Sequence, residues 1–387
     1  MRSVWLALIV LALVPTAARA DKVVSLGDSA ISGEAGRWAG NTNGSPSRTD
    51  ALGPTAYHDN AAGTGEAIAG CHRSKSAEVH IGGGVDSVNL ACSGARTYSR
   101  VSDGNFKPGI DFYNVNGNKG QALALQELAS APTKDIKAVV VLIGANDYGF
   151  ADIVQTCVTD WLTSPSWWKN YCQDDSNIAA MFTQSNIDAI TNNVRAAFER
   201  VKDAMAAGGY SETQYDILAQ TYSAPLPLSS GFRYGETGFT RQTVGGCGVW
   251  NRDANWARST VVNALNNTTR KAVAGMSNVK VLNMDEALAG RKLCENTVGL
   301  LEEKGVANWQ SPGAVDKSEW VQQIRTLSTI LPPYQLQEDG HPNYWGQLAL
   351  RNCFRQAYNG GATRAGTCSR GTGLNASDEP NMSLRSP

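Results

Sequence analysis

The sequence contains few histidines and no long run of basic residues. Among its 387 residues are four histidines, and 34 Lys and Arg stand against 35 Asp and Glu. A surface for nucleic acid is therefore not indicated. No Cys-x-x-Cys pair occurs either, which disfavours a zinc site, so we expect neither a metal ion nor another cofactor. We also expect the chain to be a monomer.

Long hydrophobic runs are absent except near the N-terminus. Arg2 precedes an apolar stretch from Val4 to Val14, which is too short for a stable membrane span. Ala18-Arg19-Ala20 is typical of a cleavage site. We therefore interpret residues 1–20 as a signal peptide. The mature chain is expected to begin at Asp21, to lack a transmembrane segment and to be secreted into the extracellular space.

All eight cysteines lie after the leader, and in an exported chain disulfide bonds are the expected state. Sequence alone cannot fix their connectivity. Pairing neighbours along the chain gives the simplest arrangement: Cys71–Cys92, Cys157–Cys172, Cys247–Cys294 and Cys353–Cys368. Each such bridge would contribute roughly 3 kcal/mol in the chain-entropy model.

Internal repeats and low-complexity linkers are also missing, so residues 21–368 are predicted to form one domain. Residues 369–387 are rich in Gly, Ser, Asn and Pro and lack an apolar pattern. We interpret them as a flexible C-terminal tail. The long segments Phe150–Asp175 and Thr221–Asn251 look irregular and rich in aromatic residues.

Short apolar, β-branched runs without alternation are typical of a parallel sheet covered on both faces. Five occur: Val23–Leu26, Val85–Leu90, Ala138–Ile143, Tyr215–Ala219 and Val279–Leu282. Helical patterns lie between or after them, over Gln121–Ala129, Ile187–Ala206, Ala254–Ala274 and Tyr344–Tyr358. The alternation predicts a doubly wound α/β fold.

Polar and glycine-rich sequences follow the carboxyl ends of three of these runs. They are Gly27-Asp28-Ser29, Cys92-Ser93-Gly94-Ala95 and Gly144-Ala145-Asn146-Asp147. Because ligands of such sheets bind beyond the carboxyl ends of the strands, we expect the three loops to meet at one site.

Ser29 and His341 are candidates for nucleophile and base. A serine hydroxyl needs a base to accept its proton, and of the four histidines only His341 has an acid three residues before it. That acid, Glu338, could orient the imidazole. Asp339 and a backbone carbonyl are the alternatives. The structural alternative for Ser29 is a helix N-cap.

The Ser29 N–H, the Gly94 N–H and the Asn146 amide are candidate donors for an oxyanion hole. Acyl transfer requires donors aimed at the oxygen on which negative charge develops. Taken singly, Gly94 could equally be a turn glycine and Asn146 a helix cap. His72, next to Cys71, is expected to pack beside a disulfide.

In this order, Gly27-Asp28-Ser29, Gly94, Gly144-x-Asn146-Asp147 and an acid three residues before His341 resemble the four blocks of the SGNH/GDSL hydrolase family. Three further stretches resemble its secreted actinobacterial esterase and lipase branch: Cys71-His72-Arg73-Ser74, Leu90-Ala91-Cys92-Ser93-Gly94-Ala95 and His341-Pro342-Asn343. No Gly-x-Ser-x-Gly elbow occurs, which disfavours the larger α/β-hydrolase class.

The resemblance implies a flavodoxin-like, three-layer α/β/α sandwich with a five-stranded parallel sheet. It implies Ser29 as nucleophile, His341 as base, and Ser29, Gly94 and Asn146 as oxyanion donors. It also implies disulfides paired in sequence order. Many relatives have Asp where this chain has Glu338, and some of this branch use a backbone carbonyl, so the role of Glu338 stays open.

The sequence therefore predicts a secreted serine carboxylester hydrolase, a GDSL-type esterase or lipase acting on acyl esters. Lipid esters, phospholipids included, are the favoured substrate. Trp161, Trp167 and Trp168 could form an apolar rim for acyl chains, a stacking surface for sugars, or the loop's own small core. A carbohydrate acetylesterase and a catalytically silent binding protein are the alternatives.

Overall fold

The computed structural model describes residues 20–102, 104–326 and 330–386. Residues 1–19 of the predicted signal peptide lie outside the described residues, so the leader remains a prediction. Within the described part of the chain, no helix is long and apolar enough to cross a membrane.

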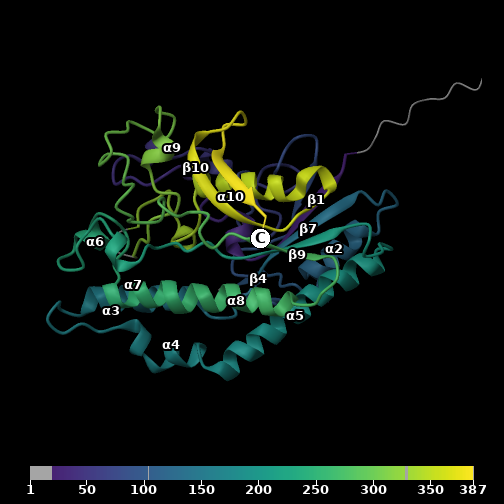
Figure 1. Cartoon of the computed structure of the whole chain (residues 1–387), viewed down its shortest axis with the longest axis horizontal. Coiled ribbons are helices and arrows are strands. Elements are labelled where there is room, and N and C mark those ends of the chain that lie inside the picture. The colour runs from purple at the N-terminus through teal and green to yellow at the C-terminus, as the bar shows by residue number, and fades with distance from the viewer. Residues whose placement is uncertain (1–19, 103, 327–329, 387) are drawn as a thin grey trace, which may run out of the picture.

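The centre of the molecule is a seven-stranded sheet with the order β11-β10-β9-β8-β7-β1-β2 (Figure 1). Its strands are β1 (Lys22–Gly27), β2 (Asp86–Asn89), β7 (Ile136–Leu142), β8 (Asp216–Gln220), β9 (Val279–Asn283), β10 (Gly366–Leu374) and β11 (Pro380–Arg385). The five predicted strands are confirmed as β1, β2, β7, β8 and β9, and they pair in parallel. The prediction of a five-stranded, wholly parallel sheet is wrong, because β10 adds in parallel to β9 and β11 adds antiparallel to β10.

The last two strands also correct the prediction of a flexible tail over residues 369–387. Met382 and Leu384 are buried on β11, whereas the alternate residues Ser383 and Arg385 are exposed. This alternation is that of a half-buried strand, but it is too short to stand out among Gly, Ser and Asn. The hairpin is held at its start by the Cys353–Cys368 disulfide.

Helices cover both faces of the sheet. The longer ones are α2 (Gln121–Ala129), α3 (Phe150–Thr163), α5 (Gln184–Ala207), α8 (Val262–Val273) and α10 (Tyr344–Tyr358). In Figure 1, α5 and α8 lie below the sheet and α10 lies above it. The α5 helix buries Ile190, Val194 and Val201 at helical spacing.

The remaining elements are short. The helices are α1 (Ser29–Ser32), α4 (Ser176–Met181), α6 (Thr240–Thr243), α7 (Asn251–Trp256) and α9 (Ala314–Lys317). The small strands are β3 (Arg100–Ser102), β4 (Asn105–Lys107), β5 (Asn114–Val115) and β6 (Asn118–Lys119). The helix predicted over Ala254–Ala274 is interrupted by a π-helical turn at Ala257–Val261.

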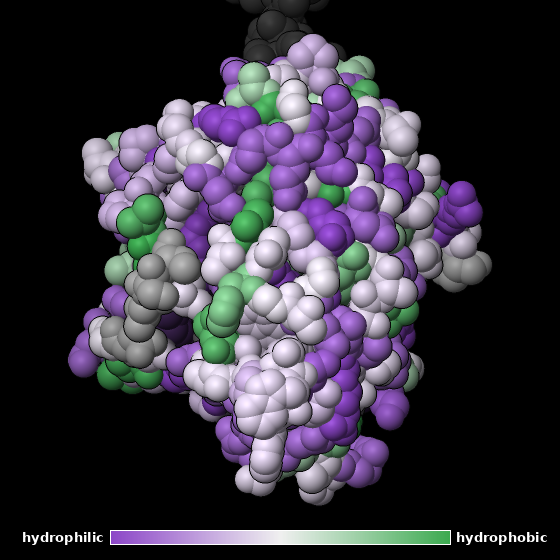
Figure 2. Space-filling model, turned by 90° about the vertical axis from the view of Figure 1, so that its left-hand side faces the viewer, coloured by the Kyte–Doolittle hydropathy of each residue, from purple (hydrophilic) through white to green (hydrophobic). Residues whose placement is uncertain are grey.

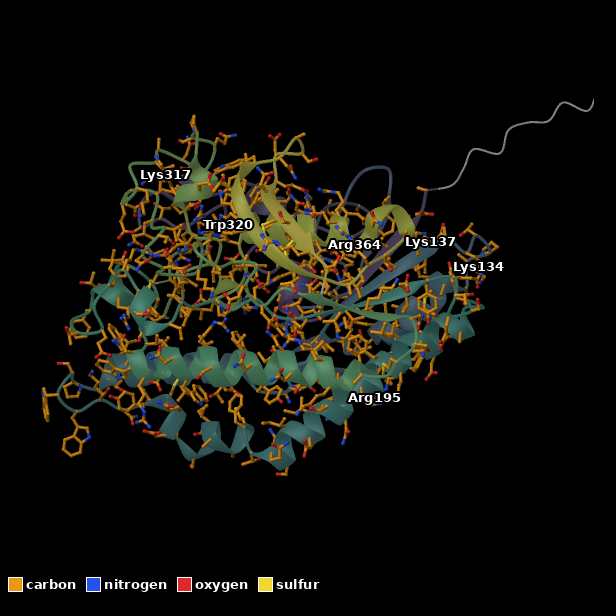
Figure 3. All side chains as sticks on the ribbon, in the orientation of Figure 1. Lys134, Lys137, Arg195, Lys317, Trp320 and Arg364 are labelled. Atoms are coloured by element: carbon orange, nitrogen blue, oxygen red, sulfur yellow. A yellow bond between two sulfur atoms is a disulfide. The ribbon has the colours of Figure 1, made fainter. Side chains whose placement is uncertain are left out.

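The segment that looked irregular from Phe150 onward is helical to Thr163. Its buried residues Ile153, Cys157 and Trp161 follow one another at intervals of four, so the helical period was present in the sequence. Figure 3 shows Lys134 and Lys137 at the right-hand end of the molecule and Lys317 near its upper left. Trp320, by contrast, is only 1% exposed.

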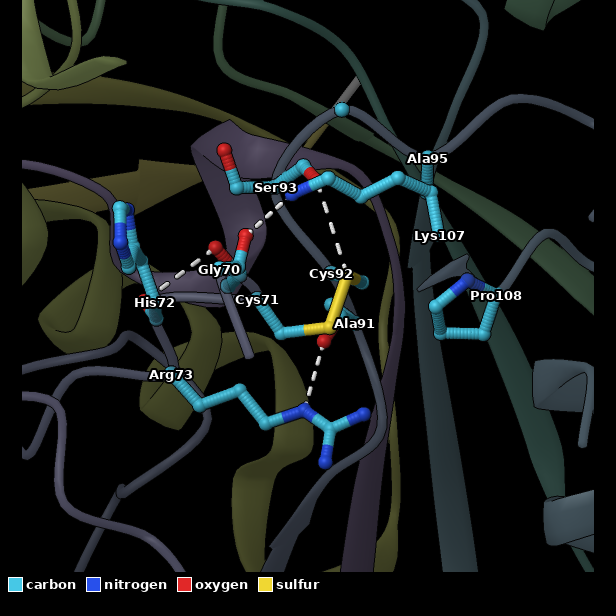
Figure 4. The surroundings of a disulfide bond; sticks show 12 residues. Gly70, Cys71, His72, Arg73, Ala91, Cys92, Ser93, Ala95, Lys107 and Pro108 are labelled. Carbon is cyan, nitrogen blue, oxygen red and sulfur yellow. Dashed lines mark hydrogen bonds between the residues drawn. A yellow bond between two sulfur atoms is a disulfide. The ribbon is translucent and has the colours of Figure 1, made fainter. Parts of the chain in front are cut away.

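All eight cysteines form disulfides, and the four pairs are those obtained by joining neighbours along the chain. That prediction is confirmed. The Cys71–Cys92 bridge holds two loops together beside the carboxyl end of β2. Figure 4 shows Arg73 there donating from Nε to the carbonyl of Ala91, at 2.7 Å.

Candidate active site

Gly27 ends β1 and fixes the direction in which the chain leaves the sheet. Its φ of 143° and the 1.9 Å that would separate a Cβ from the Leu142 carbonyl oxygen exclude any larger residue. The Gln121 amide bonds both backbone groups of Gly27, donating at 2.8 Å and accepting at 2.7 Å. Ser29 is therefore presented from a rigid strand end.

Asp28 is fully buried and caps the short helix α1 by accepting a hydrogen bond from the Ala30 N–H at 3.2 Å. The Tyr222 hydroxyl donates to its other oxygen and accepts from the Ala145 N–H. Burial raises the pKa of Asp28 to about 7, and the bond from Tyr222 opposes that rise. No motif in the sequence pointed to Tyr222, which follows the end of β8.

Ser29 and His341 are 312 residues apart in sequence, and the structure brings them together. The His341 Nε2 lies 2.7 Å from the Ser29 Oγ. The loop of His341 is fixed at its far side, because Asn343 caps α10 by accepting from the N–H groups of Trp345 and Gly346. This is the geometry in which a base accepts a proton from a nucleophile.

Glu338 does not reach His341, contrary to the prediction that its carboxylate orients the imidazole. Its Oε2 accepts from Trp38 Nε1 at 2.8 Å and from the Gln335 N–H at 3.0 Å, and its Oε1 accepts from the Tyr57 hydroxyl at 2.7 Å. The short helical turn Leu336–Glu338 turns the carboxylate away from the site. Glu338 thus ties together chain segments about 300 residues apart.

Asp339, the alternative acid, also points elsewhere. Its Oδ2 accepts from the Arg325 N–H at 2.7 Å. Burial raises the pKa of Asp339 to about 8, which leaves the carboxyl largely protonated at neutral pH. Neither sequence neighbour therefore offers His341 a charged carboxylate.

The second ring nitrogen of His341, Nδ1, is buried, and no side chain among the described residues hydrogen-bonds it. Burial lowers the pKa of His341, and the Glu34 carboxylate and the backbone at Asp339 and Glu338 oppose that shift. The backbone at these two residues thus acts on the ring, as the alternative of a backbone carbonyl expects. The imidazole is consequently held neutral, the form that a general base requires.

Glu34 and His72 form a buried pair that sequence reasoning missed. His72 Nδ1 lies 2.8 Å from both carboxylate oxygens of Glu34, and His72 Nε2 lies 3.5 Å from Glu66. Burial alone would raise the pKa of Glu34, but His72 lowers it below its ordinary value. Burial likewise opposes protonation of His72, yet Glu34 raises the pKa of that ring.

Asn146 lines the same cavity as Ser29 and His341. Its amide Nδ2 donates to the Ala95 carbonyl at 2.9 Å, so one of its two amide hydrogens is used to hold the neighbouring loop. The other is available to a ligand in the cavity.

Gly94 lies in that neighbouring loop with a φ of 79°, a conformation that favours glycine. Its carbonyl accepts from Arg100 at 3.2 Å. Asp147 connects this loop to the loop after β7. Its carboxylate accepts hydrogen bonds from the N–H of Thr97 at 3.1 Å and from the hydroxyl of Thr97 at 2.7 Å. Gly94 is not among the residues that line the cavity.

A second, almost wholly apolar cavity adjoins the first. The two share Phe150, Pro225, Val262 and Gly340 in their walls. Its remaining apolar wall comes chiefly from α3 and from the π-helical turn, with Ile153, Val154, Ala257 and Val261. Helices distorted in this way often border functional sites.

Trp161, Trp167 and Trp168, which lie in and after α3, are in two different environments. Trp161 is 3% exposed and packs against Trp250 and Phe239. Trp167 and Trp168 are 81% and 74% exposed. Figure 2 shows the end of the molecule that carries α6, where apolar residues form separate strips among polar ones.

No family model and no curated protein matches the chain. Among solved structures, the chain is similar to an extracellular lipase from Streptomyces rimosus (19% identity, 87% of this chain and 100% of that chain, TM-score 0.47). It is also similar to phospholipase A1 from Streptomyces albidoflavus (17% identity, 89% of this chain and 100% of that chain, TM-score 0.46). A family 2 carbohydrate esterase from Corynascus thermopiles matches at 12% identity, over 90% of this chain and 68% of that chain, with a TM-score of 0.37. By their names, these three structural neighbours are a lipase, a phospholipase and an esterase.

Proposed function

We propose that this chain is a secreted serine carboxylester hydrolase in which Ser29 is the nucleophile and His341 the base. The observation that carries the proposal is the 2.7 Å contact between His341 Nε2 and Ser29 Oγ, set at the wall of a cavity. The four disulfides suit an oxidising, extracellular compartment.

The reaction has two steps. Ser29 Oγ attacks the ester carbonyl while its proton passes to His341 Nε2, and His341 then protonates the departing alcohol to leave an acyl-serine. In the second step His341 takes a proton from water, the hydroxide attacks the acyl carbonyl, and Ser29 recovers its proton. Both steps need His341 neutral at the outset, as its burial favours.

Two donors are assigned to the developing oxyanion with support from the site's geometry. Ser29 is the first residue of α1, so helix bonding does not use its N–H. The second amide hydrogen of Asn146 is the other donor. The Gly94 N–H, from the adjacent loop, is the third member that the family resemblance suggests.

The favoured substrate is an ester with an extended acyl chain. The cavity that continues from the site is walled by Phe150, Ile153 and Val154 on one side and by Ala257 and Val261 on the other. An alkyl chain buried there gains about 0.8 kcal/mol per methylene. The lipase and phospholipase A1 among the structural neighbours fit this substrate class.

A carbohydrate acetylesterase is the second candidate. Trp167 and Trp168 are both exposed and pack edge to face, with ring centroids 6.3 Å apart and an angle of 76° between the rings. Flat, exposed aromatic rings suit stacking against sugars, and carbohydrate esterases are also among the structural neighbours.

Hydrolysis of p-nitrophenyl esters from acetate to palmitate, with EDTA present, tests the proposal. We expect activity that survives EDTA, rises with chain length and disappears in Ser29→Ala. A maximum at acetate would instead favour the sugar esterase. Folded, oxidised protein without activity on any ester would contradict the enzyme assignment and favour a binding protein.

A further inference from the structure

Glu34 is fully buried next to the proposed nucleophile. Its N–H donates to the Ser29 carbonyl at 3.1 Å, directly after the turn that ends α1 at Gly33. The nucleophile and the Glu34 backbone are therefore parts of one rigid turn. Ser29 also contacts His341 Nε2 through its Oγ, at 2.7 Å, so Glu34 and His341 meet at the same serine. In agreement with this, the Glu34 carboxylate opposes the lowering of the His341 pKa by burial.

The pair of Glu34 with His72 is held from several sides. The Tyr57 ring stacks on His72 with centroids 4.9 Å apart, and Ser93 bonds the Glu34 carboxylate. His72 itself has a φ of 48°, uncommon for a residue other than glycine. Such backbone conformations persist only where the surroundings enforce them, and they concentrate at functional sites. Figure 4 shows His72 and Ser93 on the same side of the Cys71–Cys92 bridge.

Glu34 differs from the other carboxyl groups near His341 in its charge. Burial raises the pKa of Glu338, of Asp339 to about 8 and of Asp28 to about 7. Only for Glu34, among these four, does a cation lower the pKa below the ordinary value. Among these four carboxyl groups, Glu34 is thus the one whose surroundings favour the ionised form. Its partner His72, whose pKa Glu34 raises, acts in the opposite direction on the His341 pKa.

We propose that Glu34, held by His72, is the positioning carboxylate of this site and stabilises the His341 imidazolium across space. Glu338 was predicted both to orient the imidazole and to stabilise its positive charge. Glu34 performs only the second of these tasks, because its carboxylate bonds His72 and not Nδ1 of His341. This inference rests on the proposed function, because it assumes that His341 gains a proton during the reaction.

Glu34→Gln tests the proposal by removing the charge while preserving shape. We expect kcat to fall about tenfold or more with little change in KM, because the lost stabilisation acts on the charged transition state. We also expect the acid limb of kcat/KM to move to lower pH, because Glu34 opposes the lowering of the His341 pKa. The titratable groups that face this region are Tyr57, Glu66, His72, Lys107, Glu338 and Asp339.

A readout without catalysis separates this inference from the proposed function. In the Ser29→Ala background, an NMR titration can follow the four imidazoles, with His341→Gln identifying the resonance of interest. A lower His341 pKa in Glu34→Gln supports the inference even if no ester is hydrolysed. An unchanged His341 pKa overturns it, whatever the activity.

Glu338→Gln is the matched control, since it makes the same change at a buried carboxyl of the same region. It should lower the melting temperature, because an amide cannot accept from Trp38, Tyr57 and Gln335 as the carboxylate does. It should leave the acid limb in place. A shift of the limb in Glu338→Gln equal to that in Glu34→Gln would overturn the assignment to Glu34.

Discussion

Both adjoining cavities of this molecule have largely apolar walls, but they differ in how many polar groups border them. The cavity that contains Ser29 and His341, here called the polar cavity, is bordered by polar groups that form hydrogen bonds between distant parts of the chain. An example is the bond that the Tyr222 hydroxyl donates to Asp28. The cavity under α3 is apolar, with Ile153 and Val261 in its wall. We infer that the polar cavity performs the chemistry and the apolar cavity selects the substrate. Substitutions in the two should therefore have different signatures.

Apart from the loss of the nucleophile Ser29, the substitution in the polar cavity with the largest expected effect on activity is His341→Gln. Without a base, kcat should fall by about 10⁴-fold or more on every ester, whatever its acyl chain. Initial rates on acetate and palmitate esters measure this. His58→Gln, in a loop where the ring lies 3.2 Å from the Gly63 carbonyl, is the matched control and should stay within about twofold of wild type. Unequal losses of activity on short and long esters would contradict the division of roles between the two cavities.

Asn146→Ala should lower kcat by about 10²–10³-fold, again equally across chain lengths, because one oxyanion donor is lost. Steady-state kinetics on two esters, with urea unfolding to check the fold, measures the effect. Since Asn146 also bonds the Ala95 carbonyl, some loss of stability is expected as well. An unchanged kcat would remove Asn146 from the site.

Ala257→Trp should act only through the apolar cavity. The indole would occupy space on the π-helical turn that borders it. Activity on palmitate should fall about tenfold or more relative to acetate, because discrimination by an apolar pocket is worth about 1–3 kcal/mol. The ratio of kcat/KM values for the two esters is the measurement. An equal loss on both would show that this cavity does not hold the acyl chain.

Asp28→Asn probes the polar cavity through a property other than activity, the pH dependence of stability. The pKa of Asp28 rises from 3.8 to about 7 on folding. Its titration therefore favours the folded state most below pH 3.8, and that contribution is lost as the pH rises to about 7. The unfolding free energy of wild type minus that of Asp28→Asn should decrease over this range and level off above it. Urea unfolding at about pH 4, about 5.5 and about 8 measures it; a constant difference would contradict the raised pKa of Asp28.

The sequence predicted those parts of the fold and site that leave a local signal. Five parallel strands, the helix Tyr344–Tyr358, the four disulfides and the meeting of Ser29 with His341 all follow from apolar runs, cysteine order and short motifs. The strand pair β10 and β11 was missed because its inward residues, such as Met382 and Leu384, are few. The helical period of α3 was present but was obscured by the aromatic residues that follow it.

The partner of His341 could not be read from the sequence for a different reason. Glu338 is three residues away, yet its carboxylate bonds Trp38 and Tyr57. Glu34 is some 300 residues away from His341 in sequence but directly follows the turn of Ser29, so the fold that brings His341 to Ser29 brings it to Glu34 as well. Spacing along the chain predicts which groups can meet, but the direction of a side chain depends on the hydrogen bonds that it finds.

Reaction with a fluorophosphonate, followed by peptide mass spectrometry, tests the central claim most directly. The account predicts a single adduct on Ser29, formed faster in wild type than in His341→Gln and absent from Ser29→Ala, because only a serine activated by a base is phosphonylated readily. Folded, oxidised protein that carries no adduct, or that carries it on another residue, would contradict the account.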